Sequence, residues 1–130
     1  MVYLVTMTPK QKIAVIEDEI SICDMYRMKL AGAGYDVKVA HDGQDGLNLL
    51  EDFKPELILL DLKMPVMNGD EMLAKLRETD WGAEIRVIVL TNISRDEAPR
   101  TLQFLHIDRY IVKAHHTPTQ VLQIVSEILN

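Results

Sequence analysis

Residues 57–61 read Leu-Ile-Leu-Leu-Asp, four apolar residues followed at once by a carboxylate. A short apolar run of this kind is typical of a strand that is buried on both faces, as strands of parallel sheets are. Three further runs share this character, at residues 13–16, 87–90 and 110–112. A fifth segment, residues 35–39, alternates between apolar and polar positions, which predicts a strand at the edge of the sheet.

Helical patterns separate the predicted strands. Residues 20–33 carry apolar side chains every three or four positions, and capping signals at Asp42, Asn68 and Thr117 predict the starts of later helices. Another helix is expected after Ser94. Its expected apolar face consists of Ala98, Leu102 and Leu105. Strand and helix therefore alternate five times, which predicts an α/β fold with a doubly wound, five-stranded parallel sheet.

Size and composition limit the possible classes of protein. The 130 residues have the length of one domain, and we expect an N-terminal arm over residues 1–11 and the domain over residues 12–130. The net charge of −6 argues against a nucleic-acid-binding surface. No apolar run approaches the roughly 18 residues of a membrane span. The single cysteine, Cys23, and the lack of a convincing signal peptide favour a cytoplasmic location.

Charged and polar side chains follow the predicted strands. Glu17 and Asp18 come after the first run, Asp61 after the third, Thr91 after the fourth and Lys113 after the fifth. Because ligands of open α/β sheets bind at the carboxyl ends of the strands, these groups should converge on one rim. Taken singly, each is as readily a helix cap or a solvated loop residue. Asp61 is harder to dismiss, because a carboxylate at the end of a buried strand is costly unless it is paired.

The residue types at this rim favour phosphoryl transfer to a carboxylate. Three clustered carboxylates repel one another unless a cation joins them, and Mg²⁺ is suited to such a set of oxygen ligands. An aspartate can act as a nucleophile and become an aspartyl phosphate. A metal ion, a lysine and a hydroxyl group can together neutralise the charge on the transferring phosphoryl group.

Four motifs carry a resemblance to a known family. They are residues 14–19, 60–69, 90–92 and 110–113, which read Ala-Val-Ile-Glu-Asp-Glu, Leu-Asp-Leu-Lys-Met-Pro-Val-Met-Asn-Gly, Leu-Thr-Asn and Tyr-Ile-Val-Lys. In this order and spacing they resemble the receiver domain of two-component response regulators, and the chain is similar to the stand-alone chemotaxis regulator. The resemblance implies a flavodoxin-like strand order, 2-1-3-4-5.

The resemblance also implies a phosphorylation site and a magnesium site. Asp61 corresponds to the phosphoryl acceptor. Asp18 corresponds to a direct Mg²⁺ ligand and Glu17 to a more distant ligand that acts through water. The backbone carbonyl of Lys63 corresponds to a third protein ligand, beside Asp61 itself.

Three further residues correspond to the parts that respond to phosphorylation. Thr91 resembles the hydroxyl that moves to bind the phosphoryl group, and Lys113 resembles the lysine that pairs with the acceptor or with a phosphoryl oxygen. Tyr110 resembles the switch aromatic, which swings inward when Thr91 moves. The expected response is a shift between two conformations of the rim.

A receiver domain implies particular partners. The phosphoryl donor would be a phosphohistidine on a sensor histidine kinase or a histidine phosphotransfer protein, and the protein would not be an enzyme beyond its own phosphorylation and dephosphorylation. The face made by the fourth helix, fifth strand and fifth helix would serve an output partner or a homodimer. An unphosphorylated docking module is the alternative. A haloacid-dehalogenase type of enzyme is disfavoured, because Lys63 stands where such enzymes carry a second aspartate.

The chain departs from the family pattern at three positions. Ala114 replaces the usual proline after Lys113, Asn92 replaces a very small residue, and His106 replaces a glycine. A cis peptide bond before a residue other than proline costs about 2.5–4 kcal/mol. We therefore expect a trans bond between Lys113 and Ala114, with the Lys113 ammonium group still directed toward Asp61.

Overall fold

A five-stranded parallel sheet forms the centre of the protein. The computed structural model describes residues 9–130, so most of the expected N-terminal arm, residues 1–8, lies outside the described residues. The strand order is β2-β1-β3-β4-β5, which confirms the predicted order. The strands are β1 (Lys12–Ile16), β2 (Asp36–Ala40), β3 (Leu57–Leu60), β4 (Arg86–Thr91) and β5 (Arg109–Val112). The alternating segment is the edge strand β2, and the wholly apolar β3 is buried along its length at the centre.

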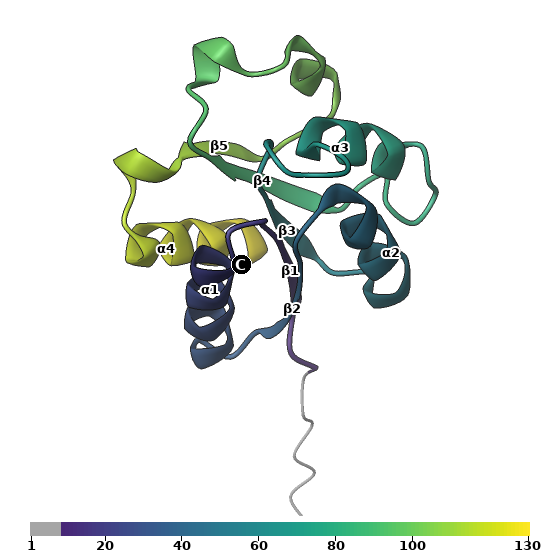
Figure 1. Cartoon of the computed structure of the whole chain (residues 1–130). Coiled ribbons are helices and arrows are strands. Elements are labelled where there is room, and N and C mark those ends of the chain that lie inside the picture. The colour runs from purple at the N-terminus through teal and green to yellow at the C-terminus, as the bar shows by residue number, and fades with distance from the viewer. Residues whose placement is uncertain (1–8) are drawn as a thin grey trace, which may run out of the picture.

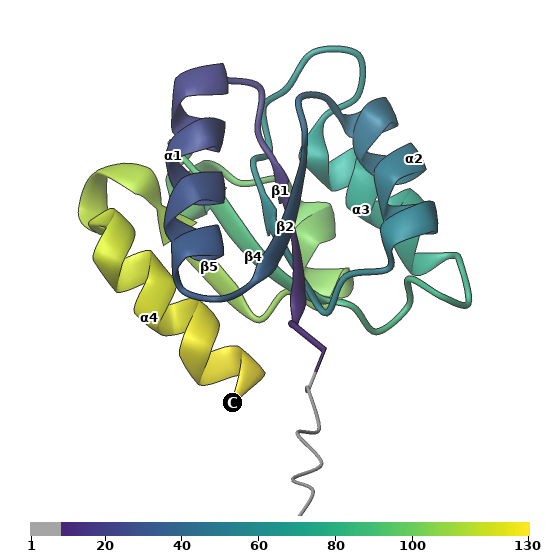
Figure 2. The same cartoon turned by 90° about the horizontal axis from the view of Figure 1, so that it is seen from below.

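Helices cover both faces of the sheet (Figures 1 and 2). The α-helices are α1 (Ile20–Gly32), α2 (Gly43–Phe53), α3 (Gly69–Arg77) and α4 (Pro118–Leu129). Helices α2 and α3 pack on one face, where Leu50 and Leu73 join the first apolar core. Helices α1 and α4 pack on the other face, where Leu30 and Val125 join the second core. The alternation of inward side chains along each strand therefore divides the apolar residues between two layers.

The predicted capping signals act at two of the helices. The Asp42 carboxylate accepts a hydrogen bond from Asp45 N at 2.8 Å and begins α2. Thr117 and Gln120 form a reciprocal capping box at the start of α4, with Pro118 in the first turn. These side chains bond backbone N–H groups that a helix leaves without internal partners.

The α-helix predicted after Ser94 is wrong. Two short 3₁₀ helices, η1 (Arg95–Glu97) and η2 (Arg100–Phe104), occupy that segment. Pro99 separates them, because its ring removes an N–H donor and disfavours the helical conformation of the preceding residue. Ala98 accordingly has an extended backbone, with φ −66° and ψ 149°. Leu102 is still buried in the first core. The apolar spacing of this segment therefore reflects which side chains pack into the core, although the backbone is not an α-helix.

Arg77, the last residue of α3, joins two loops. Its guanidinium group donates hydrogen bonds to five backbone carbonyls, those of Gly82, Ala83, Ile85, Leu105 and His106. The first three belong to the loop before β4 and the last two to the turn before β5. One side chain thus fixes both segments against the end of α3.

Across residues 9–130, no helix combines the length and the apolar character needed to cross a bilayer.

Candidate functional site

The predicted rim residues lie together at the carboxyl ends of the strands. Glu17 directly follows β1, Asp61 follows β3, Thr91 ends β4 and Lys113 follows β5. The sheet ladder continues one residue beyond two of the strands, because Glu17 N donates to Ala40 O and Asp61 N donates to Ile16 O, each at 3.0 Å. The backbone therefore holds the two carboxylates side by side.

Lys113 bridges the two buried carboxylates. Its ammonium nitrogen donates to Glu17 Oε1 and lies 3.3 Å from Asp61 Oδ2. The side chains of Glu17, Asp61 and Lys113 are only 5%, 9% and 11% exposed. A buried charge is tolerated only with a partner of opposite charge and with hydrogen bonds. Here the Lys113 ammonium group provides both to the two carboxyl groups.

The two carboxyl groups differ in their affinity for a proton. Burial, together with the nearby Asp61, raises the pKa of Glu17 to about 8. Burial acts on Asp61 in the same direction, but hydrogen bonding by Glu17 and Thr91 and the charge of Lys113 outweigh it, so the pKa of Asp61 falls below its usual value. Of the two groups, Glu17 thus binds a proton more tightly, and Asp61 ionises more readily and is the carboxylate able to act as a nucleophile.

Oxygen atoms of three acidic side chains could hold a metal ion. Carboxylate oxygens of Glu17, Asp18 and Asp61 lie within 4.8 Å of one another. Glu17 Oε2 is buried and has no hydrogen-bond partner among residues 9–130. An orphaned buried oxygen among carboxylates fits a hard divalent cation such as Mg²⁺, which prefers oxygen ligands and retains several waters. Asp18 is the most exposed of the three.

The loop after Asp61 is packed closely against the start of α3. Leu62 N donates to Asp61 Oδ1 at 2.7 Å, and Gly69 N donates to Leu62 O at 2.8 Å. A methyl group on Gly69 would lie 2.1 Å from the Asp61 carbonyl oxygen, so only glycine fits there. Lys63, two residues beyond Asp61, has an exposed side chain at the surface of this loop.

Thr91 and Tyr110 contact the same short segment of chain. Thr91 is buried at the end of β4, and its hydroxyl oxygen accepts a hydrogen bond from Ile93 N at 3.4 Å. The Tyr110 hydroxyl donates to Ile93 O at 2.7 Å, and the Arg95 guanidinium lies 5.7 Å from the centre of its ring. The segment after Thr91 therefore connects the rim to the half-buried Tyr110.

One contact to the rim was not predicted. His41, which follows the edge strand β2, places its ring Nδ1 2.9 Å from the backbone oxygen of Glu17. Because a carbonyl only accepts hydrogen bonds, Nδ1 carries the proton in this contact. His41 directly follows β2, as the other rim residues follow or end their strands, so its position in the sequence carries the same signal.

Two departures from the family pattern have visible outcomes. The described part of the chain contains no cis peptide bond, so the Lys113–Ala114 bond is trans, as predicted. Lys113 nevertheless reaches Asp61. His106 has a left-handed backbone, with φ 54°, in the place where the family pattern has glycine. A side chain at positive φ costs roughly 1–2 kcal/mol, which glycine would avoid.

Comparison with known proteins identifies this arrangement. The family model described as the response regulator receiver domain matches residues 13–126. The chain belongs to this family. It is 38% identical over 104 residues to a probable transcriptional regulator, ycf27, of Porphyridium aerugineum, an alignment that covers 80% of this chain and 42% of that protein. The receiver domain thus spans less than half the length of that curated relative.

Solved structures of receiver proteins share the fold. The chemotaxis response regulator CheY4 of Vibrio cholerae superimposes with a TM-score of 0.84 at 26% identity, covering 92% of this chain and 99% of that one. The phosphorylated cyanobacterial phytochrome response regulator RcpA gives a TM-score of 0.76 at 28% identity, covering 92% and 91%. The family assignment places the protein among signalling switches of two-component systems rather than among ordinary enzymes.

Proposed function

We propose that this receiver domain accepts a phosphoryl group on Asp61 from a phosphohistidine of a sensor histidine kinase or a histidine phosphotransfer protein. The observation that carries the proposal is the buried contact of Lys113 with Glu17 and Asp61, which places an ammonium group beside an ionised carboxylate at the rim. The phosphorylated state of RcpA, a relative of similar fold, supports the same chemistry.

The transfer follows from the ionised state of Asp61. A carboxylate oxygen attacks phosphorus and forms an O–P bond, while the N–P bond of the donor breaks. The imidazole leaves with the electron pair of that bond and takes up a proton. Lys113 stays beside the acceptor and neutralises negative charge on the phosphoryl oxygens, as the Thr91 hydroxyl does from the end of β4.

The acidic cluster is proposed as a magnesium site. Asp18 and Asp61 would hold the ion directly, Glu17 through a water molecule, and the backbone carbonyl of Lys63 would be a further ligand. When bound, Mg²⁺ supplies positive charge to the phosphoryl oxygens and to the carboxylates. An ion bound there would lower the pKa of Glu17, which burial raises, and would give its orphaned Oε2 a partner.

Signal output is proposed to begin at Thr91. Its hydroxyl turns toward the phosphoryl group and donates a hydrogen bond to a phosphoryl oxygen. The hydrogen bond that Ile93 N donates to the hydroxyl oxygen is lost in this movement. The segment after Thr91 moves with it, which releases the Tyr110 hydroxyl from Ile93 O and lets the ring move inward. Phosphorylation thereby favours one of two rim conformations, because only that conformation makes these contacts.

The surface that binds an output partner is also proposed. The face formed by η1, η2, β5 and α4 is adjacent to Tyr110 and is the proposed surface for an output partner or a second copy. The net charge of −6 makes nucleic acid an unfavourable ligand for this domain itself. We place the domain in the cytoplasm with its kinase, and assign it no membrane contact.

The decisive experiment is intact-mass analysis after incubation with acetyl phosphate and Mg²⁺. The wild-type protein should gain the mass of one phosphoryl group, and Asp61→Asn should gain none. Lys113→Met should be phosphorylated more slowly and should lose the structural response, read as NMR shift changes at Tyr110. If the wild-type protein stays unmodified under conditions that phosphorylate another receiver, the unphosphorylated docking module becomes the better interpretation.

A further inference from the structure

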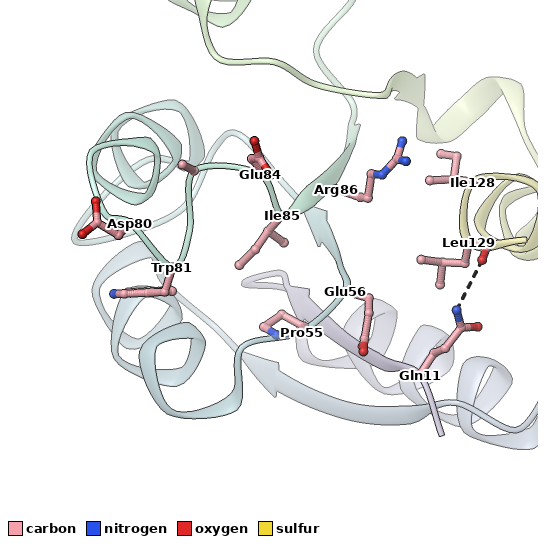
Figure 3. A pocket seen from close by; sticks show the side chains of 11 residues that line it. Gln11, Pro55, Glu56, Asp80, Trp81, Glu84, Ile85, Arg86, Ile128 and Leu129 are labelled. Atoms are coloured by element: carbon pink, nitrogen blue, oxygen red, sulfur yellow. Dashed lines mark hydrogen bonds between the residues drawn. The ribbon is translucent and has the colours of Figure 1, made fainter. Parts of the chain in front are cut away.

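A groove lies at the edge of the sheet opposite the phosphorylation site. It runs along the amino ends of the strands, because β1 and β3 begin next to its residues Gln11 and Glu56, and β4 begins at Arg86 within it. Its volume is about 660 Å³, within the range of roughly 300–1,000 Å³ that ligand sites occupy. Figure 3 shows the side chains that line it, with Trp81 and Pro55 on one side and Ile128 and Leu129 on the other.

Both apolar cores reach the surface in this groove. Trp81 and Ile85 are partly buried extensions of the core under α2 and α3. Ile128 and Leu129 extend the core under α1 and α4. The groove therefore has apolar side chains at both ends, which apolar residues of a bound segment could cover.

The groove also carries negative charge without matching cations. Glu56, Asp80 and Glu84 are exposed, and within residues 9–130 none of them takes part in an ion pair. The one cation in the lining, Arg86, already pairs with Asp108 at 3.0 Å. Glu56 already accepts a hydrogen bond from Lys12 N, so an occupant that supplies positive charge would meet chiefly Asp80 and Glu84, which form no ion pair within residues 9–130.

We propose that this groove is a docking site for a basic peptide segment of a partner protein. Apolar side chains of the segment cover Trp81 at one end of the groove and Ile128 at the other, and flanking lysine or arginine residues face Asp80 and Glu84. The same carboxylates repel nucleic acid and anionic lipid, and a second copy of this chain would bring a net charge of −6 against them. The proposal does not rest on phosphorylation, because the groove and Asp61 lie at opposite ends of the strands.

The test uses the single tryptophan of the chain, Trp81, as the reporter. The full chain is titrated with the peptide Arg-Lys-Leu-Leu-Lys-Arg while tryptophan emission is recorded. We expect a saturable blue shift, because the indole loses water as the leucines cover it. A peptide with serine in place of leucine, and one with glutamate in place of the basic residues, should produce no saturable shift.

Two charge reversals provide the matched comparison. Glu84→Lys changes the groove and should weaken binding at least about tenfold, since like charges then face each other. Glu71→Lys changes the net charge equally at the other end of α3, and should weaken binding less than about threefold. Asp61→Asn should bind the peptide as the wild type does, so the outcome is independent of the proposed phosphorylation.

Three results would overturn the proposal. The first is the absence of any saturable shift with the wild-type chain. The second is an equal loss of binding in Glu84→Lys and Glu71→Lys, which would indicate general attraction to an acidic protein. The third is undiminished binding of the serine peptide, which would show that the apolar walls of the groove contribute nothing.

Discussion

Replacing Gly69 with alanine should damage the phosphorylation site without touching any of its charged groups. The added Cβ would lie 2.1 Å from the Asp61 carbonyl oxygen and 3.0 Å from both the Asp61 carbonyl carbon and Leu62 Cα. Ordinary contact begins at 3.4 Å, so the backbones must separate by about 1.3 Å (3.4 − 2.1). All three atoms belong to the main chain, so no side-chain rotation relieves the overlap.

The expected result has two parts. Overpacking against a fixed backbone lowers the free energy of unfolding by about 1–3 kcal/mol. A shift of Asp61 by even part of that displacement also breaks its 3.3 Å contact with Lys113, which should slow phosphorylation by acetyl phosphate. Urea unfolding followed by Trp81 fluorescence measures the first effect, and intact mass against time measures the second.

Gly32→Ala is the matched control, because a methyl group at Gly32 would meet nothing within 4 Å. At the end of α1 it should leave phosphorylation unchanged and raise stability by up to about 1 kcal/mol. A Gly69→Ala protein with wild-type stability and wild-type phosphorylation kinetics would refute the argument that the closeness of Gly69 to Asp61 positions the acceptor.

Three further outcomes are expected. The pKa of Glu17 is about 8 in the folded protein against an ordinary value of 4.5, so the folded state binds more protons than the unfolded state between these pH values. Without Mg²⁺, the free energy of unfolding should therefore fall by less than about 5 kcal/mol as pH rises from 4.5 to 8. In Glu17→Gln, the urea midpoint should lose this dependence on pH. His106→Gly should raise the free energy of unfolding by up to about 1 kcal/mol, because glycine adopts a φ of 54° without strain, and the urea midpoint should rise accordingly. An unchanged or lower midpoint would contradict this. Burial raises the pKa of Cys23 to about 11, so iodoacetamide should modify the native protein at pH 8 far more slowly than the urea-unfolded chain, and equal rates would place the thiol at the surface.

Local sequence patterns predicted the sheet but not every helix. Wholly apolar runs such as Leu57–Leu60 admit few alternatives to buried strands, so a parallel sheet and the convergence of Asp61 with Glu17 follow from the residues, while the strand order followed from the family resemblance. The apolar spacing after Ser94 favours an α-helix, but Pro99 lacks an N–H donor and disfavours the helical conformation of Ala98, so the segment forms two 3₁₀ helices instead.

Other features had no readable signal in the sequence. The raised pKa of Glu17 depends on burial and on the distance to its neighbours, which emerge only from the packed rim. The groove beside Trp81 arises where two layers end together, and no single stretch of sequence encodes that juxtaposition. Trp81 extends the first core and also lines the groove.

Arg77 has a consequence for the way the molecule opens. The carbonyls that it binds belong to residues 82–85 and 105–106, two loops that are distant along the chain. Neither loop can loosen without losing hydrogen bonds to the same guanidinium group. The amide protons of both loops should therefore exchange with solvent through one shared opening event. In Arg77→Lys, whose ammonium offers no planar fork of donors, the two sets of amides should become independent, each with its own exchange rate.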